Sequence, residues 1–421
     1  SKRCRERSWQ LWKRRLGACC VGETHLSTTA HILRIGHSSA FLDESLPLRR
    51  EPRAPKRQRP AKFWQQFEDR ALFYDCFWSE DGNAIILLSP PPRNLLDHYR
   101  TAQVLAQPSG TPVKLSLHPA RSTMVSVVTD APQGTESLVF TIGGQRHVID
   151  VQPNHCDALA GRRLLFTMNK DNDPQWIEAW VRWHVTMHGT DAVVIFDNGS
   201  TLYEPQVLEE RIGAIEGVKT VCVVSWPYRY GPHDPGVVFH RYWANFLQVS
   251  SYTMLFRRLA RRCEAVLNCD IDELIGNDGG PGAYERAVDS PDGIVTCKGT
   301  WVECVTDPAE TDQPNHFAYR YRDKNPLKAI CANKWALDPS RAWCDDLDVM
   351  PSVHRIYGIS KSKGRAAPKL PFWHFKAINT NWKTNRRRAD NFDPSRHRRL
   401  FDLDGEIAQY LERSKTIGRK G

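Results

Sequence analysis

Residues 265–273 read Ala-Val-Leu-Asn-Cys-Asp-Ile-Asp-Glu, a short apolar run that leads directly into carboxylates. Asp270 and Asp272 stand two residues apart at the end of what we expect to be a buried strand. Magnesium and manganese bind carboxylate oxygens together with the phosphate oxygens of a substrate. The stretch is therefore typical of a site for a divalent metal and a nucleotide diphosphate. The ordinary alternative is a pair of helix-capping carboxylates ahead of Leu274-Ile275.

Predicted strands and helices alternate along the chain from residue 161 onward. Apolar runs typical of strands are separated by segments whose large apolar residues recur at helical spacing. Strands are expected at 164–168, 192–196, 220–224 and 265–269, and helical residues at 176–187 and around 237–262. This repetition predicts a largely parallel sheet with helices on both sides.

Polar clusters follow the predicted strands where each strand ends. Asn169-Lys170-Asp171-Asn172 comes after the first strand, and Asp197-Asn198-Gly199-Ser200 comes after the second. Ligands of open parallel sheets bind beyond the carboxyl ends of the strands, so both clusters and residues 270–273 are expected to line one crevice. Taken alone, the cluster at Asp197 is also an ordinary turn sequence.

The region before residue 161 has a different pattern, with short alternating strands and frequent turns. Gly143-Gly144 separates two of these strands as a hairpin turn. The expected strands are 71–74, 84–88, 113–117, 124–128, 138–142 and 147–151. They predict a small β-sandwich that packs on the catalytic domain or binds an acceptor.

The ordered motifs of the chain together resemble one enzyme family. The segments 176–184, 193–200 and 270–275, and then Phe372-Trp373-His374-Phe375-Lys376 followed by Lys383, are similar to the GT-A glycosyltransferases of family 92 and the related family 2-like group. The resemblance covers roughly residues 65–390 and includes the β-rich region that opens at Ala71. It implies an α/β fold, a Rossmann-like GT-A catalytic domain with a mostly parallel sheet, preceded by a small β-sandwich module.

The resemblance also implies roles for individual residues. Asp197 is expected at the base or ribose, Asp270 at the ribose or metal, Asp272 at the metal, and His374 as a third metal ligand, with His354 as its competitor. Further donor contacts are expected from Lys170, Asp171, Asn198 and Lys376. The chain departs from the family pattern in two places. It has Lys170-Asp171-Asn172 where the family has Lys-Asn-Glu, and Lys376-Ala377 where the family has Lys-Ser.

The implied reaction is the transfer of a sugar from a nucleotide-diphosphate donor, expected to be a UDP-sugar, with Mn²⁺ or Mg²⁺ as cofactor. The expected acceptor is a hydroxyl of a glycan or lipid-linked glycan, in the synthesis of a surface polysaccharide or another glycan. An inverting enzyme needs a carboxylate base near that hydroxyl. Glu303 is our candidate, and Asp345 and Asp346 are alternatives. Two rival functions stay open, a non-catalytic glycan- or polyanion-binding protein and a metal-dependent nucleotidyl- or phosphotransferase.

Charge is unevenly distributed along the 421 residues. Residues 1–60 hold 14 Lys or Arg against 5 Asp or Glu, and residues 381–421 hold 11 against 6, so the middle is slightly acidic. Basic ends on an acidic body predict tails that contact anionic lipid, as peripheral membrane contact, or a polyanionic partner, rather than nucleic-acid binding. The ordinary alternative is solvated surface charge. The expected division is a basic Pro/Arg-rich tail or linker (1–61) with little fixed structure, the β-rich module (62–160), the GT-A domain (161–400) and a basic C-terminal helix or tail (401–421).

The expected location is the cytoplasm, with membrane association through the tails. The 12 cysteines lack Cys-x-x-Cys spacing, which argues against structural zinc and favours reduced thiols. An N-terminal anchor removed from the chain, with a Golgi-type location, stays open as an alternative.

Overall fold

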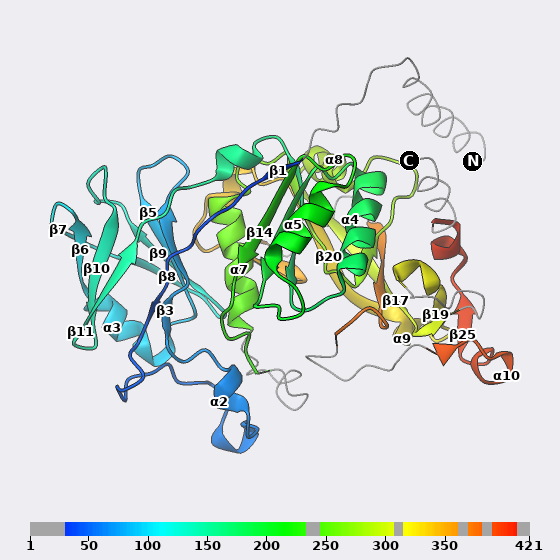
Figure 1. Cartoon of the computed structure of the whole chain (residues 1–421), viewed down its shortest axis with the longest axis horizontal. Helices are drawn as coiled ribbons and strands as arrows, with labels where there is room; N and C mark the ends of the chain where they lie inside the picture. The colour runs from blue at the N-terminus through cyan, green and yellow to red at the C-terminus, as the bar shows by residue number, and fades with distance from the viewer. Residues whose placement is uncertain (1–29, 233–244, 307–314, 361–368, 381–389, 411–421) are drawn as a thin grey trace, which may run out of the picture.

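The computed structural model describes residues 30–232, 245–306, 315–360, 369–380 and 390–410 (Figure 1). These residues form a mixed α/β structure with one nine-stranded sheet and two four-stranded antiparallel sheets. No helix among them is long and apolar enough to cross a membrane.

The nine-stranded sheet contains the strands expected on either side of the 265–273 stretch. Its order is β1 (His31–Ile32), β14 (Thr220–Ser225), β13 (Ala192–Asp197), β12 (Arg163–Asn169), β15 (Ala265–Asn268), β20 (Ile330–Leu337), β17 (Ile294–Val302), β23 (Leu370–Phe375) and β16 (Glu273–Ile275). The first five strands pair in parallel. Strand β20 is antiparallel to β15 and β17, and β16 is antiparallel to β23. The expectation of a largely parallel sheet thus holds on one side of β15, while the other side is mixed.

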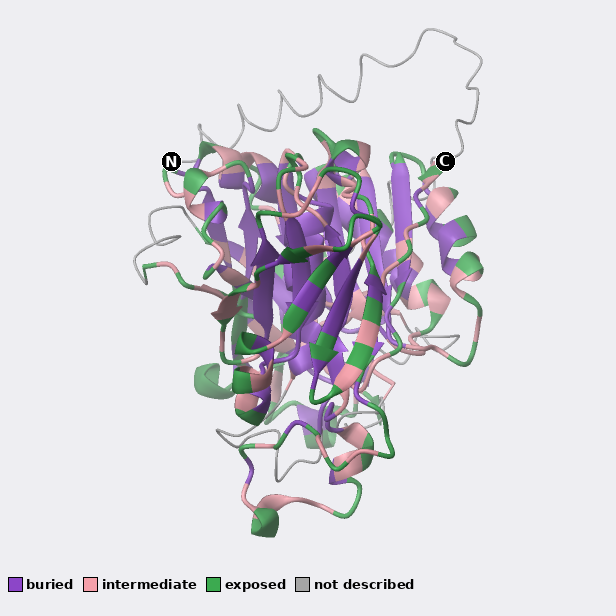
Figure 2. Cartoon of the chain, turned by 90° about the vertical axis from the view of Figure 1, so that its left-hand side faces the viewer, coloured by how far each residue is buried: buried purple, intermediate pink, exposed green. Residues whose placement is uncertain are grey.

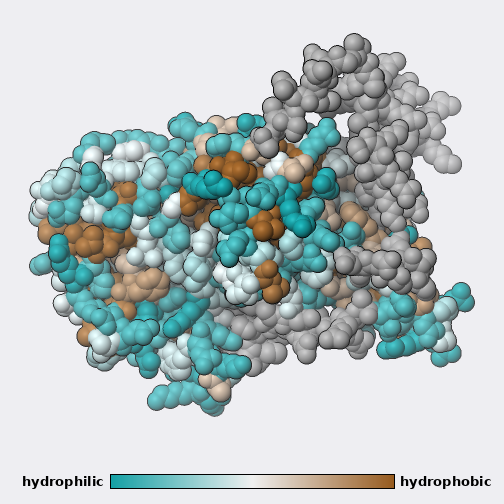
Figure 3. Space-filling view, in the orientation of Figure 1, coloured by the Kyte–Doolittle hydropathy of each residue, from teal (hydrophilic) through white to brown (hydrophobic). Residues whose placement is uncertain are grey.

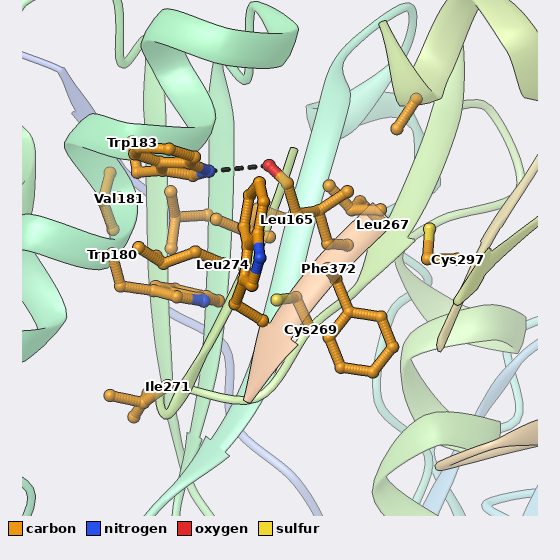
Figure 4. Close-up of a cluster of buried hydrophobic side chains, with 14 of the residues drawn as sticks. Leu165, Trp180, Val181, Trp183, Leu267, Cys269, Ile271, Leu274, Cys297 and Phe372 are labelled. Atoms are coloured by element: carbon orange, nitrogen blue, oxygen red, sulfur yellow. Dashed lines mark hydrogen bonds between the residues drawn. The ribbon is translucent and has the colours of Figure 1, made fainter. Parts of the chain in front are cut away.

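Helices cover both faces of this sheet. On one face lie α4 (Pro174–His188), α5 (Pro205–Gly213) and α8 (Ala283–Asp289), which share a core with alternate residues of β12, β13 and β15. Figure 4 shows Trp180 and Trp183 of α4 in this core, packed near Leu165, Leu267 and Leu274. On the other face lies α7 (Phe246–Arg258), packed on the alternate strand residues.

The ends of α4 follow from its sequence. Asp173 caps the N-terminus by accepting a hydrogen bond from the Gln175 N–H at 2.8 Å, and Pro174 occupies the first turn, where its missing N–H costs nothing. Gly189 ends the helix in the left-handed conformation, with φ of 68°, which favours glycine. These signals fix where the helix begins and therefore which side chains it turns toward the sheet.

The β-rich region forms two sheets over a shared core. One sheet contains β4 (Asp75–Trp78), β5 (Ile85–Ser89), β9 (Met124–Val128) and β8 (Ser116–Pro119), and the other contains β11 (Gln145–Asp150), β10 (Ser137–Ile142), β6 (Gln103–Gln107) and β7 (Thr111–Val113). Figure 2 shows exposed and buried residues alternating along the strands of the β11-β10-β6-β7 sheet. Strands β5 and β9 are buried along their whole length because the second face of their sheet packs on α7.

Residues 30–61 differ from the tail or linker with little fixed structure that we expected there. They contain β1, β2 (Ala40–Phe41), which pairs with β3 (Ala71–Phe73), and the 3-10 turn η1 (Lys56–Gln58). Arg50 is fully buried and donates to the carbonyls of Glu68, Ala71 and Pro91. A buried arginine whose donors meet backbone carbonyls fixes this segment on the body of the protein.

The remaining elements are short and lie mostly in connections. They are α2 (Phe63–Gln66), η2 (Arg93–Leu95), α3 (Leu96–Arg100), η3 (Cys156–Leu159), β18 (Val305–Thr306), η4 (His316–Ala318), β19 (Tyr321–Asp323), α9 (Pro326–Ala329), η5 (Ala342–Cys344), β21 (Met350–Ser352), β22 (Arg355–Tyr357), β24 (Asp390–Asn391), α10 (Pro394–His397) and β25 (Phe401–Leu403). Residues 405–410 are helical, and Ile407 is buried in the core on the α4 side of the sheet. Lys383 and the distal parts of both predicted tails lie outside the described residues.

Candidate metal and substrate site

The Asp270–Glu273 stretch links two strands of the large sheet. Strand β15 ends at Asn268, and β16 begins at Glu273 and pairs with β23 so that Glu273 lies opposite His374. The backbone carbonyl of Asp272 also accepts a hydrogen bond from the Phe375 N–H at 2.8 Å. The sheet therefore brings His374 to the carboxylates from about a hundred residues further along the chain.

Asp272, Glu273 and His374 form the group that is suited to a metal ion. His374 Nε2 lies 3.0 Å from Asp272 Oδ2, and His374 Nδ1 lies 3.4 Å from Glu273 Oε1. One ligand atom from each residue can be chosen so that all lie within 4.8 Å of one another. Trp301 stacks on the imidazole with 3.9 Å between ring centroids, which fixes the plane of the ring.

A buried lysine lies on the other side of Glu273. Lys334 Nζ is 2.6 Å from Asp270 Oδ2 and 3.0 Å from Glu273 Oε2, and the lysine side chain is fully buried. Burial alone would lower the pKa of Lys334, but the charges of Asp270 and Glu273 outweigh it and raise that pKa. Burial raises the pKa of Glu273, against the opposing charge of Lys334. Lys334 thus pairs with both acids, but Glu273, and not Asp270, also lies beside Asp272 and His374.

The charges of this cluster fit a divalent cation. Asp270, Asp272 and Glu273 supply three negative charges, and Lys334 supplies one positive charge. A neutral imidazole and one divalent ion would bring the cluster to zero, which a partly buried site favours. Glu273 Oε1 is moreover buried and makes no hydrogen bond to any residue that the structure describes, so it has an open ligand position.

The proposed base and the expected phosphate-binding lysine lie next to each other. Lys376 Nζ forms an ion pair with Glu303 Oε1 and lies 5.6 Å from the centroid of the Trp301 ring. Because Trp301 also stacks on His374, the pair is connected to the metal group through this one indole. The sequence-based proposals Glu303, Lys376, Asp272 and His374 therefore come together in one cluster.

The alternative bases belong to a different part of the structure. Asp345 forms an ion pair with Arg261, and the backbone carbonyl of Asp346 accepts from Arg257. Neither aspartate has a contact with Glu303 or His374 in the described ranges. The geometry favours Glu303 of the three.

Asp197 is the last residue of β13 and is buried. Its Oδ1 accepts from the Asn169 side chain at 2.8 Å and from the Ser200 hydroxyl at 2.6 Å, and its Oδ2 accepts from the Ser200 N–H at 2.9 Å. Asn198 donates from its side-chain amide to the Trp226 carbonyl at 2.8 Å. These bonds connect the loops after β12, β13 and β14 into one rim.

Lys170 and Asp171 bind the same rim from the loop after β12. Lys170 Nζ donates to the carbonyls of Asn198 and Gly199 at 2.9 and 3.0 Å. Asp171 has a φ of 53° and accepts from the Thr201 N–H at 2.6 Å. In this structure both side chains bind the neighbouring loop, while the topology places them at the same carboxyl edge as Asp270.

Helix α4 supports the free edge of β16 with side chains in place of a neighbouring strand. The Ile275 carbonyl accepts from Trp183 Nε1 at 2.7 Å, the bond that is dashed in Figure 4. The same carbonyl accepts from His188 Nε2 at 3.0 Å, and the Ile275 N–H donates to His184 Nε2 at 3.4 Å. Burial lowers the pKa of His188 to about 4, so the ring is neutral near pH 7. These contacts fix the strand that carries Glu273.

A third buried histidine holds the loop between the two carboxylates. His316 Nε2 donates to the Ile271 carbonyl at 2.6 Å, and burial lowers the pKa of this histidine to about 4. The competing ligand His354 bonds the Asn333 carbonyl through Nδ1 at 3.1 Å, and it is not part of the metal group.

Sequence reasoning missed two residues of this cluster. Glu273 adjoins the Asp-x-Asp pattern, and its pairing with His374 depended on the register of β16 with β23. Lys334 is the clearer omission. A lysine directly before the apolar run Trp335-Ala336-Leu337 indicates a charged side chain at the edge of the core, where it needs an acidic partner.

No protein-family model matches this chain, and no curated protein matches its sequence. The chemistry of the cluster therefore rests on its geometry and on the sequence resemblance described above.

Proposed function

We propose that this chain is a metal-dependent glycosyltransferase of the GT-A type that moves a sugar from a nucleotide-diphosphate donor to a glycan hydroxyl. The observation that carries the proposal is the group of Asp272, Glu273 and His374 at the carboxyl end of β15. Ligands of doubly wound sheets bind at such an edge. Lys170, directly after β12, and Asp197, the last residue of β13, lie along the same edge.

Asp272 and His374 would hold the metal, with Glu273 Oε1 as the third ligand. A bound Mn²⁺ or Mg²⁺ supplies charge neutralisation for the diphosphate that leaves with the nucleoside. Lys334 would remain between Asp270 and Glu273 and keep the second carboxylate oxygen of Glu273 occupied. It thereby orients Glu273 toward His374, as an outer partner orients a metal ligand.

Glu303 would accept the proton of the attacking acceptor hydroxyl. Its ion pair with Lys376 would hold the carboxylate in position beside Trp301. Lys376 would offer the diphosphate a charge-assisted hydrogen bond from the side of Glu303. The exposed part of Trp301 would then face the sugar, since aromatic rings pack well against sugar rings.

Lys170, Asp171, Asp197 and Asn198 would shape the nucleotide end of the crevice. Their mutual hydrogen bonds hold the loops in place before the donor arrives, so less ordering is left for binding. A carboxylate offers about four lone-pair positions, so Asp197 can accept from a ribose hydroxyl or base while it keeps Ser200.

Manganese-dependent hydrolysis of a panel of nucleotide sugars tests the proposal. We expect release of free sugar from one donor, loss of that release in Asp272→Asn, and unchanged release in the matched control Asp97→Asn, an exposed carboxylate on α3. Release of inorganic phosphate without sugar would instead indicate the phosphotransferase alternative. Equal turnover by the Asp272 variant would rule out the metal group as the site.

A further inference from the structure

A concentrated basic surface lies over the segment that precedes α2. Residues 49–62 hold seven Lys or Arg and a single acid, Glu51. Two arginines from neighbouring loops join them, and Figure 3 shows the surface over α2, at the lower edge, as hydrophilic. We call this surface the basic face, and it consists of Arg49, Arg53, Lys56, Arg57, Arg59, Lys62, Arg93 and Arg121.

The basic face is built on a fixed framework. The Asn94 side chain donates to the Arg49 carbonyl at 3.0 Å and accepts from the Glu51 N–H at 2.8 Å. The guanidinium groups of Arg49 and Arg59 lie over the Trp64 ring, at 4.3 and 5.4 Å from its centroid. Together with the buried Arg50 described above, these contacts hold the cations in place instead of leaving them on a loose chain.

Like charges are held close together at the centre of the basic face. Arg93 Nη2 donates to the Arg121 carbonyl at 3.0 Å, and Arg93 adopts a left-handed φ of 56°. Burial and then the charges of Arg53, Arg50 and Arg121 lower the pKa of Arg93 to about 10. Its Nε is buried and makes no hydrogen bond within the part of the chain that the structure describes. Such crowding is unfavourable alone and is relieved when an anion binds.

The cations of the face have few acidic partners of their own. Arg49, Lys56, Arg57, Arg59, Lys62 and Arg93 form no ion pair with any acidic residue in the described ranges. Surface arginines elsewhere in the chain commonly do, as in the pairs Arg211–Glu178 and Arg262–Glu80. These six cations are thus not compensated by any acidic residue that the structure describes, on a body that is otherwise slightly acidic.

The basic face adjoins the proposed active-site edge of the large sheet. Arg229, in the loop after β14, donates to the Phe67 carbonyl at 3.2 Å and pairs with Asp69 at 2.5 Å, directly after α2. In the same loop, the Trp226 N–H donates to the Asp197 carbonyl at 2.7 Å. The segment of the basic face is therefore hydrogen-bonded, through the loop after β14, to the rim that holds Asp197.

We propose that the basic face binds a polyanionic glycan whose carboxylate or sulfate groups pair with the fixed guanidinium and ammonium groups. Guanidinium groups bind such planar or multi-oxygen anions with two parallel hydrogen bonds. The further statement that this glycan is the acceptor rests on the proposed function.

Two other kinds of polyanion fit the face less well. Binding to a bilayer surface needs exposed apolar side chains beside the cations, and no large exposed apolar side chain lies among described residues 49–67. Single-stranded nucleic acid is held by open aromatic rings, whereas Trp64 is half-buried with two guanidinium groups over it. A linear acidic polysaccharide needs neither feature.

Titration of the full chain with acidic polysaccharides tests the inference. The probes are polygalacturonate for carboxylate, heparin for sulfate and dextran as the uncharged comparison, each at low and high salt. We expect binding to one or both acidic chains, weakened by salt, and none to dextran. The triple variant Lys56→Glu, Arg57→Glu, Lys62→Glu should bind roughly tenfold or more weakly, because three attractive contacts at exposed cations become repulsive.

A matched triple variant separates the loss of the basic face from the general effect of a lower net charge. Lys328→Glu, Arg398→Glu, Arg399→Glu makes the same charge change at exposed cations far along the chain and should bind within about twofold of wild type. Equal loss in both variants, or no binding of wild type to either acidic chain, would overturn the proposal. So would tighter binding to phosphatidylserine vesicles or to an RNA oligonucleotide.

Failure of this inference is distinguishable from failure of the proposed function. Asp272→Asn should bind the polysaccharide normally while it loses metal-dependent turnover. The triple variant of the basic face should keep hydrolysis of the nucleotide sugar in the absence of acceptor. If its transfer to the bound polysaccharide is also undiminished, the basic face does not hold the acceptor.

Discussion

Replacement of Lys334 by Met tests the charge structure of the site. The change removes a buried cation that contacts both Asp270 and Glu273 and leaves an uncharged chain of similar length. At an effective dielectric constant of about 20, two unit charges at separations of 2.6 and 3.0 Å attract by about 6 kcal/mol for each pair. Part of this attraction already offsets the cost of burying the lysine. Removal of one partner of a buried pair typically costs about 3–5 kcal/mol, and we expect a loss of unfolding free energy in that range.

Urea unfolding of Lys334→Met, followed by tryptophan fluorescence and by circular dichroism, measures this loss. Because Glu273 is then buried without its cation, its pKa rises further, and the folded state holds a proton that the unfolded state releases. The deficit should therefore be largest near pH 8 and shrink as the pH falls toward 5. The exposed Lys328→Met is the control and should change the stability by less than about 0.5 kcal/mol. A loss under about 1 kcal/mol that is independent of pH would refute the charge assignment.

Two further predictions concern the residues that support the site. His316 and His188 each have a pKa of about 4 in the folded state and about 6.5 in the unfolded state. The neutral ring of each therefore stabilises the fold fully above pH 6.5, and this stabilisation declines as the pH falls. Protonation of each histidine should lower the free energy of unfolding by about 2 kcal/mol at pH 5. His316→Gln keeps a donor for the same carbonyl, and it should reduce the loss of stability at low pH, measured by urea unfolding, by about that amount. Gly299→Ala would place a methyl group 2.1 Å from Cys331 Sγ. This overpacking at β17 of the nine-stranded sheet should destabilise the protein by about 1–3 kcal/mol, which a lower thermal midpoint would show.

The controls for these predictions come from the same chain. Gly405→Ala places its methyl group where no atom lies within 4 Å, so its thermal midpoint should match that of wild type. A Gly299 variant with a wild-type midpoint would contradict the packing around β17. A His316 variant with an unchanged pH profile would show that the ring is not the neutral donor to Ile271 that the structure describes.

The sequence was sufficient for the strands on one side of the large sheet. Strands β12, β13, β14 and β15 are apolar runs bounded by turns, and their parallel order follows from the helices between them. The other side could not be predicted. Strands β17 and β20 pair in antiparallel fashion, and β16 has only three residues, with its register set by β23. Short strands carry little periodicity, so tertiary pairing decides where they lie.

The site was predictable to a similar extent. Asp272 was named from the Asp-x-Asp pattern and His374 from the family resemblance, and the structure places them 3.0 Å apart. Glu273, and not Asp270, lies beside His374 because the buried Lys334 pairs with Asp270. No local sequence pattern predicts where Lys334 lies in the fold. The basic segment 49–62 was expected to be a tail because prolines and arginines dominate it, yet the burial of Arg50 fixes it on the body.

The central claim is that Asp272, Glu273 and His374 hold a divalent metal at the substrate edge of the sheet. Anomalous diffraction at the manganese edge, from crystals soaked with MnCl₂ and the nucleoside diphosphate of the preferred donor, tests it most directly. We predict an anomalous peak at about 2.1 Å from an Asp272 carboxylate oxygen and from a His374 ring nitrogen. The peak should be absent in crystals of Asp272→Asn. Bound diphosphate with no manganese at these residues in the wild-type crystal would contradict the account.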